Sequence, residues 1–281
     1  MSTSAPAFLS LEALADRIPN GARIALPADY SGCAMAAVRV LMRRPMHLRV
    51  RDLHIVSVPQ GGFQVDMLVG AGCVARIEAA AVTLGEHGLA PRFAAAIKAG
   101  EIEMWDATCP AIHAGLQAAE KGVPFMPLRG IIGSDLLRVR PDWKVIDNPL
   151  GESGTRDPIV ILPAIRPDVT LFHALKADRQ GNVWIGVQRE LVTMAHASRQ
   201  AFVTVERIED GDFLRDPLLA AGTIPSLYIT AIAEAPNGAW PVGLDNAYPA
   251  DARALAEYAA AAATPKGFAR WAAEPVAESV G

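Results

Sequence analysis

Short apolar runs alternate along the chain with amphipathic segments of about ten residues. Apolar runs bounded by turn-forming residues are typical of buried strands, and apolar positions at helical spacing indicate helices. We predict strands at residues 23–26, 53–58, 123–127, 159–163, 168–174, 183–185, 200–205 and 227–234. We predict helices at residues 10–18, 34–43, 90–99, 111–121 and 252–263.

Cap and turn residues mark several ends of these segments. Ser10 is placed to cap the first helix, and Pro91 suits the first turn of the third. We expect Thr264 and Pro265 to end the final helix, because proline restricts the residue before it. Residues 140–158 are polar and rich in turn-forming residues, so we interpret them as a loop excursion.

Strands that alternate with helices indicate an α/β protein with a mostly parallel sheet. The prediction is an open, mostly parallel sheet with flanking helices. The sequence has no internal repeat of fixed period and no polar stretch that reads as a linker. Residues 1–281 are therefore expected to form a single domain.

Composition and charge exclude several classes of protein. Hydrophobic residues make up 51% and charged residues 20% of the chain, which excludes a disordered chain. No basic region with a following apolar run opens the sequence, and no apolar run is long enough for a bilayer. We expect neither a signal peptide nor a membrane segment. The net charge of −4 gives no electrostatic basis for binding nucleic acid.

The three cysteines, Cys33, Cys73 and Cys109, are odd in number and lack CxxC spacing. This pattern predicts neither a disulfide framework nor a zinc site, and we expect no bound metal. Scattered thiols are typical of a reducing compartment, which favours the cytoplasm.

Three glycine-containing junctions follow predicted strands, at residues 29–32, 59–63 and 129–135. Ligands of open α/β sheets bind beyond the carboxyl ends of strands, where backbone N–H groups can hold an anion or a thioester oxygen. None of the three matches a P-loop or GxGxxG, and each can also be a simple turn. The candidate substrate-binding residues are Ser31, Gly32, Gly61, Gly62, Phe63, Arg129, Gly133 and Ser134.

The stretch GGFQVDMLVGAGCV at residues 61–74 resembles family I coenzyme A transferase A subunits of the glutaconate CoA-transferase type. The resemblance continues in the same order through GLAPRF at 88–93, GVPFMP at 122–127 and IDNP at 146–149. It then includes DVTLFHALKADRQGN and ends with APNGAWP at 235–241. It therefore covers nearly the whole chain.

This resemblance implies an α subunit of a heteromeric enzyme that moves CoA between an acyl-CoA and a carboxylic acid. The nucleophilic glutamate of such enzymes belongs to a B-type partner, so an αβ or α2β2 hetero-oligomer is implied. The CoA thioester is the substrate, and no separate cofactor is implied. Carboxylate attack on a thioester divides the exchange into two reversible acyl transfers.

One departure from the family pattern leaves alternatives open. Residues 27–32 read Pro-Ala-Asp-Tyr-Ser-Gly where the family commonly has Gly-Gly-Phe. A similar subgroup hydrolyses a ring carbon–carbon bond in CoA-linked steroid fragments with an acid of the A subunit. Asp106 lies near that position, and Thr108 or Cys109 is the alternative counterpart. Asp106 is then a candidate general base, although an acid before a helix is also favoured by the helix dipole. A non-catalytic acyl-CoA-binding subunit is the third possibility.

Other polar residues each have a structural alternative. Arg129 suits a substrate carboxylate or a CoA phosphate, and equally an ion pair with a nearby acid. Ser134 can donate to substrate or cap a turn. Glu86 and His87 can form a catalytic pair or a solvated loop, and His173 is interpreted as a core histidine bonded to backbone.

Overall fold

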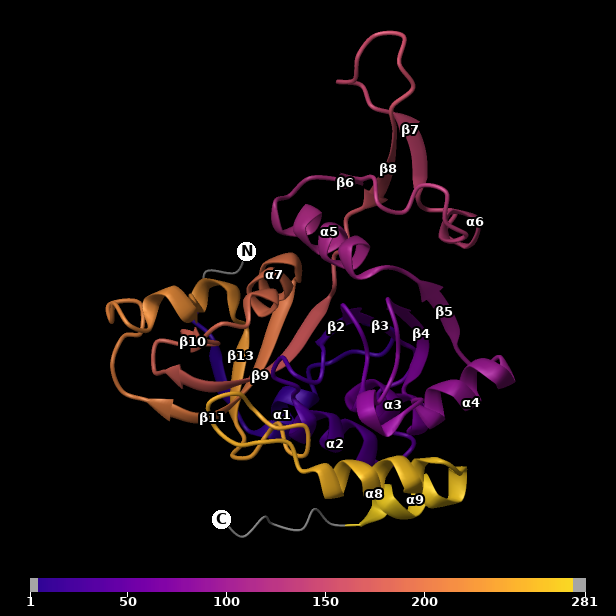
Figure 1. Cartoon of the computed structure of the whole chain (residues 1–281). Coiled ribbons are helices and arrows are strands. Elements are labelled where there is room, and N and C mark those ends of the chain that lie inside the picture. The colour runs from indigo at the N-terminus through magenta and orange to yellow at the C-terminus, as the bar shows by residue number, and fades with distance from the viewer. Residues whose placement is uncertain (1–4, 275–281) are drawn as a thin grey trace.

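A computed structural model describes residues 5–274. Its main feature is a ten-stranded sheet in which eight strands follow the order β1-β13-β11-β9-β2-β3-β4-β5. Every neighbouring pair along this path is parallel, whereas the short strands β10 and β12 attach antiparallel beside β9. The predicted open, mostly parallel sheet with flanking helices is confirmed (Figure 1).

The strands of this sheet have well-defined bounds. They are β1 (Ala7–Leu9), β2 (Arg23–Pro27), β3 (Leu53–Val58), β4 (Val74–Ala79), β5 (Glu103–Asp106), β9 (Val169–Asp178), β10 (Val183–Trp184), β11 (Gln200–Glu209), β12 (Thr223–Ile224) and β13 (Ala231–Glu234).

Helices cover both faces of the sheet, and each face has its own buried apolar cluster. On one face lie α1 (Leu11–Ala15), α2 (Met35–Arg43), α3 (Phe63–Gly70), α4 (Pro91–Ala99), α8 (Ala252–Ala262) and α9 (Pro265–Ala273). On the other lie α5 (Cys109–Glu120) and α7 (Arg189–Ala197). Short helical turns are α6 (Leu136–Val139), η1 (Gly85–His87), η2 (Ala220–Gly222) and η3 (Ser226–Tyr228).

Several helix ends follow from the local sequence. The Ser10 side chain accepts a hydrogen bond from the N–H of Ala13 at 3.1 Å and caps α1 as predicted. Pro91 is the first residue of α4. The prediction that Thr264 and Pro265 end the final helix is wrong in one respect. They end α8 but also begin α9, because the Thr264 hydroxyl caps it and Pro265 occupies its first turn.

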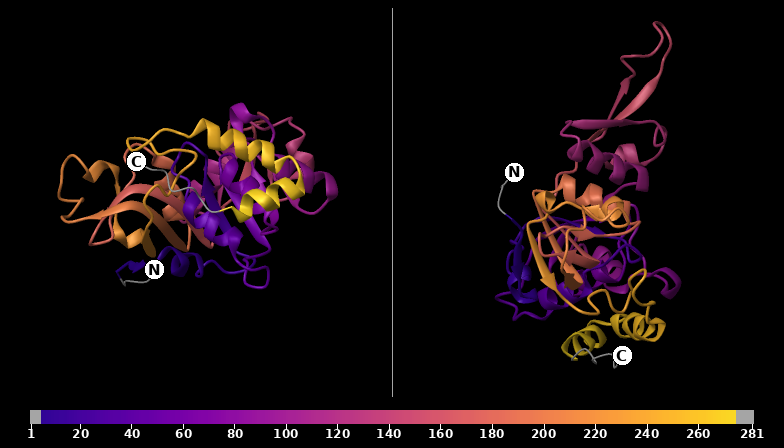
Figure 2. Two further views of the ribbon diagram at one scale, coloured as in Figure 1. Left: turned by 90° about the horizontal axis from the view of Figure 1, so that it is seen from below. Right: turned by 90° about the vertical axis from the view of Figure 1, so that its left-hand side faces the viewer.

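A small antiparallel sheet projects from the α5 face (Figure 1, and Figure 2, right). It has the order β6-β8-β7 and consists of β6 (Phe125–Leu128), β7 (Lys144–Asp147) and β8 (Pro158–Pro163). The interpretation of residues 140–158 as a loop excursion is therefore wrong for β7. All four β7 residues are exposed, so no apolar alternation marks this strand in the sequence.

The direction in which successive strands are added to the sheet reverses between β2 and β9, which are parallel neighbours. From β2 the chain proceeds outward to β3, β4 and β5, whereas from β9 it proceeds in the other direction to β11 and β13. Loops at the carboxyl ends of strands diverge at such a reversal and leave a crevice. The loops after β2 and β3 belong to this edge of the sheet.

Candidate active site

A cavity of about 290 Å³ lies at the carboxyl ends of β2, β3 and β4. The loops that follow these strands form most of its wall, and the segment before and within α8 completes it. The lining residues are Asp29, Tyr30, Gln60, Gly61, Gly62, Phe63, Thr83, Leu84, Gly85, Glu86, His87, Val242, Ala250 and Leu255. Three of the predicted site residues, Gly61, Gly62 and Phe63, are therefore brought together here.

The turn at Gly61 and Gly62 leads directly from β3 into α3. Gly61 exchanges backbone hydrogen bonds with the loop after β4, since its N–H donates to Ala81 O and its carbonyl accepts from Thr83. The Gly62 carbonyl accepts the first hydrogen bonds of α3. Within residues 5–274, no protein group accepts a hydrogen bond from the Gly62 N–H. The Gly62 N–H is thus a backbone donor of the cavity wall without a protein acceptor.

Asp29 is the main residue of this cavity that sequence reasoning missed. Both of its carboxylate oxygens lie 3.2 Å from the N–H of Phe63, at the start of α3. Burial raises the pKa of Asp29 to about 6, although the hydrogen bonds from Phe63 and Cys33 oppose this effect. The sequence signals for Asp29 were its place two residues beyond β2 and its position at the start of the junction at residues 29–32.

Ser31 and Gly32, also predicted to bind substrate, do not line the cavity. Ser31 is fully buried, and its hydroxyl donates to the Glu190 carboxylate at the start of α7. Gly32 accepts from the N–H of His173 at 2.7 Å with a φ of +80°, and a Cβ there would lie 2.2 Å from His173 O. Both residues hold the loop against α7 and β9.

The third glycine loop connects β6 of the small sheet to α6 and does not line the cavity. Arg129 forms a two-pronged ion pair with Asp157, with Nη2 and Oδ2 2.8 Å apart, and this pair lowers the pKa of Asp157. The Ser134 hydroxyl donates to Ile131 O at 2.8 Å within the turn that contains Gly133. Arg129 and Ser134 thus have the structural contacts that were the alternatives to substrate binding.

Asp106 ends β5 and is exposed. It pairs in register with Ala79 of β4, so it lies at the same edge of the sheet as the cavity but does not line it. Its backbone carbonyl accepts a hydrogen bond from the buried Arg140 at 3.1 Å.

His87 and Glu86 line the cavity from the η1 turn. The His87 ring meets the Phe63 ring edge-on, with centroids 5.8 Å apart. His173 is a core residue as interpreted, but its ring bonds side chains rather than backbone. Nδ1 lies 2.8 Å from Thr204 Oγ1, and Nε2 lies 2.7 Å from Glu206 Oε1.

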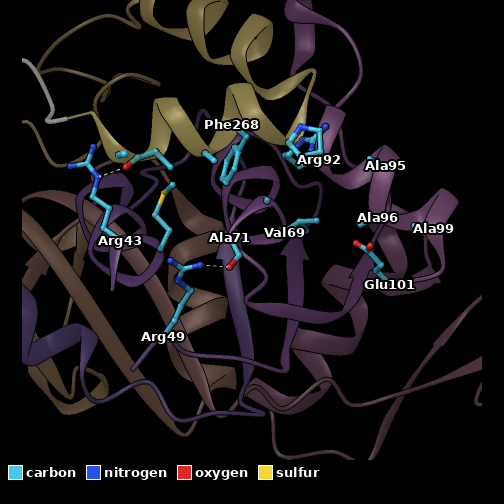
Figure 3. A pocket seen from close by; sticks show the side chains of 16 residues that line it. Arg43, Arg49, Val69, Ala71, Arg92, Ala95, Ala96, Ala99, Glu101 and Phe268 are labelled. Atoms are coloured by element: carbon cyan, nitrogen blue, oxygen red, sulfur yellow. Dashed lines mark hydrogen bonds between the residues drawn. The ribbon is translucent and has the colours of Figure 1, made fainter. Parts of the chain in front are cut away.

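A larger cavity of about 770 Å³ lies below α9, at the opposite edge of the sheet (Figure 3). Two arginines line this cavity. Arg49, which precedes β3, donates to Ala71 O at the end of α3. Arg43 donates to Ala272 O at the end of α9. These two guanidinium groups satisfy free carbonyls at helix ends. Their contacts are accounted for by the fold, so this cavity is the weaker candidate.

Residues 5–274 hold no group of three or more His, Cys, Asp or Glu side chains that could bind a metal ion. Among residues 5–274, no helix combines the length and apolar character needed to cross a membrane.

Comparison with known proteins identifies the family. The coenzyme A transferase family profile matches residues 10–235. The A subunit of 3-oxoadipate CoA-transferase from Pseudomonas knackmussii is 30% identical over 272 residues, which cover 94% of this chain and 91% of that protein. The IpdA subunit of the cholesterol ring-cleaving hydrolase from Rhodococcus jostii is 30% identical, with coverage of 85% and 81%.

A solved structure gives the same result. Glutaconate coenzyme A-transferase from Acidaminococcus fermentans matches with a TM-score of 0.83 and 27% identity, over 94% of this chain and 86% of that chain. The chain therefore belongs to the coenzyme A transferase family. The resemblance inferred from residues 61–74 and the later motifs is confirmed.

Proposed function

We propose that this chain is the A subunit of a heteromeric CoA-transferase, which moves CoA between an acyl-CoA and a carboxylic acid. The observation that carries the proposal is the turn at Gly61 and Gly62, which lines a cavity at the carboxyl ends of β2, β3 and β4 in a coenzyme A transferase fold. We infer that the cavity holds the acyl group of the thioester. Its size suits a small acyl group rather than the whole of CoA.

The chemistry needs a donor for the oxygen that becomes negative when a carboxylate attacks the thioester carbonyl. A preorganised backbone N–H at that oxygen stabilises the transition state. We assign this role to the Gly62 N–H, which belongs to a residue of the cavity wall and has no protein acceptor among residues 5–274. Attack forms an acyl–enzyme anhydride and releases the CoA thiolate. The thiolate then attacks the enzyme acyl carbon, leaves CoA on the enzyme as a thioester and frees the first carboxylate.

The attacking carboxylate is assigned to a B-type partner subunit. Asp29 is engaged by the Phe63 N–H, and Asp106 lies outside the cavity lining. The names of the relatives as A subunits support a partner, for which αβ and α2β2 are the proposed compositions. A cytoplasmic location completes the proposal, supported by three cysteines without disulfides.

Borohydride trapping of the complex with its B-type partner tests the proposal. Acetyl-CoA or succinyl-CoA serves as donor, with 3-oxoadipate and glutaconate as acceptors. We expect inactivation by borohydride only when acyl-CoA is present, because the reagent reduces the enzyme-bound CoA thioester. Borohydride without acyl-CoA is the control. Absence of CoA transfer and of inactivation with every donor contradicts the transferase and supports a non-catalytic acyl-CoA-binding subunit.

A hydrolase is the second candidate function, favoured by the position of Asp106 at the carboxyl end of β5 and by the Rhodococcus jostii relative. In the transferase, Asp106→Asn should retain at least about a tenth of the activity. A loss of about 1,000-fold, equivalent to about 4 kcal/mol of transition-state stabilisation, together with no trapped adduct, would establish the hydrolase instead.

A further inference from the structure

Asp29 caps the helix α3 from a different loop of the chain. It belongs to the loop after β2, whereas α3 begins 34 positions later with Phe63. The residue at the N-cap of α3 is Gly62, which has no side chain to bind the free N–H groups. The Asp29 carboxylate supplies that acceptor for Phe63.

The Asp29 carboxylate has two further contacts, with the Gly62 backbone and with the Cys33 thiol. A Cβ on Gly62 would lie 1.8 Å from Asp29 Oδ2, so the carboxyl group rests directly against the Gly62 backbone. The Cys33 thiol, in the same loop as Asp29, lies 3.7 Å from Oδ1. Cys33 is fully buried and also contacts the carbonyls of Pro27 and Ala28. Asp29 is therefore fixed in its own loop and touches the next one.

We propose that Asp29 is a positioning residue, whose carboxyl group joins the loops after β2 and β3 and thereby fixes the Gly62 N–H in the cavity. The inference rests on the proposed function for the meaning of that N–H. The capping contact itself does not depend on which reaction the enzyme performs. A general acid–base role for Asp29 is the competing possibility.

Asparagine and alanine separate these two roles. Asn keeps the oxygen that accepts from Phe63 but cannot take up a proton, whereas Ala removes the acceptor. In the complex with the B-type partner, assayed with succinyl-CoA and glutaconate, Asp29→Asn should retain kcat within about 3-fold. Asp29→Ala should lower kcat by at least 10-fold, with a smaller change in the KM for acyl-CoA, because transition-state contacts are lost more than ground-state binding.

Asp66 provides a matched control. It is a buried aspartate that accepts from the N–H of Phe93 at 2.7 Å near the start of α4, and it also binds the Tyr258 hydroxyl at 2.7 Å. It does not line the cavity. Asp66→Ala should lower the melting temperature at least as much as Asp29→Ala while kcat stays within about 3-fold. An equal loss of kcat at Asp66 would assign the effect to stability and overturn the proposal.

Amide hydrogen exchange gives a readout that needs no turnover. In the unliganded complex, a peptide containing residues 61–66 should exchange at least 10-fold faster in Asp29→Ala than in the wild type, and near the wild-type rate in Asp29→Asn. Asp29→Ser, whose hydroxyl is too short to reach Phe63, replaces Asp29→Ala if the alanine variant fails to fold.

Two outcomes would overturn the proposal. Unchanged exchange in the variants without the acceptor would show that Asp29 does not fix the turn. A loss of kcat of about 100-fold in Asp29→Asn, with unchanged exchange, would identify an acid–base group. If no donor and acceptor pair reacts in any variant, the proposed function fails while the exchange result still decides the positioning role.

Discussion

At the residue scale, the Asp29 carboxyl group connects the loops after β2 and β3, and its ionisation in the folded protein costs free energy. The pKa of Asp29 in the folded protein, about 6, lies above the value of about 3.9 for an exposed aspartate. The folded state therefore binds this proton more tightly than the unfolded state does. Asp29 makes stability fall as the pH rises from about 4 to about 6, and the loss persists at higher pH.

Asp29→Asn should remove this dependence, because the amide keeps the hydrogen bond to Phe63 and has no charge to bury. The free energy of unfolding of the variant relative to the wild type should increase by up to about 2 kcal/mol between pH 4 and pH 8. Urea unfolding at a series of pH values measures it. A difference that stays constant over this range would show that Asp29 titrates normally in the folded protein.

At the scale of elements, Glu206 joins β11 to three other segments. Its carboxylate accepts from the Asn237 N–H at 2.7 Å and the Tyr248 hydroxyl at 2.6 Å, and it contacts His173 Nε2 of β9. Burial alone would raise the pKa of Glu206, but the hydrogen bonds from His173 and Tyr248 outweigh it and the pKa is lowered. Glu206 thus fixes the segment that leads to the cavity wall at Val242.

Glu206→Gln should lower the free energy of unfolding by about 2 kcal/mol at pH 7, because charge-assisted hydrogen bonds are lost. The stabilisation belongs to the ionised carboxylate, so the difference from wild type should shrink as the pH falls below about 4. Chemical denaturation measures both. Glu257→Gln, which removes an exposed i,i+4 partner of Arg253, serves as control and should change stability by less than about 0.5 kcal/mol. An effect of Glu206→Gln on stability as small as that of Glu257→Gln would contradict the role assigned to Glu206.

At the scale of the whole molecule, the edge of the sheet with the cavity exposes large apolar side chains. Tyr30 on the cavity wall is 61% exposed, and Leu89, which follows the η1 turn, is 79% exposed. Val187 is 78% exposed, and the adjacent Gln188 donates to Tyr30 O. Stable subunit interfaces bury apolar and aromatic residues of this kind. Under the proposed function, we expect the B-type subunit to bind at this edge.

The chain co-expressed with its B-type partner should elute with it as one hetero-oligomer at micromolar concentration. Leu89→Glu combined with Val187→Glu should separate the two, because buried charges without partners oppose association. Met46→Glu, at an 86% exposed position in the turn between α2 and β3, should leave the complex intact. Size-exclusion chromatography with light scattering measures the result. Independent elution of the wild-type chains would refute the heteromeric assignment.

The sequence alone determined the fold class, most strands and helices, and the family. Buried strands such as β3 appear as continuous apolar runs, and cap residues such as Ser10 mark helix ends locally. The helix α3 was not predicted because it is buried from Phe63 to Val69, so no polar face gives it helical periodicity. The strand β7 was missed because all four of its residues are exposed, so buried and exposed positions do not alternate along it.

The tertiary structure alone decided which of the candidate residues line the same cavity. The turn at Gly61 and Gly62 lines the cavity, whereas Ser31 is directed to Glu190 and Arg129 to Asp157. Asp29 joins the site through a hydrogen bond across 34 positions of the chain. Local propensity and hydrophobic periodicity depend on neighbours within a few residues. They therefore predict individual strands and where each strand ends. Which loops meet depends on strand order and on the reversal between β2 and β9, which only the assembled sheet defines.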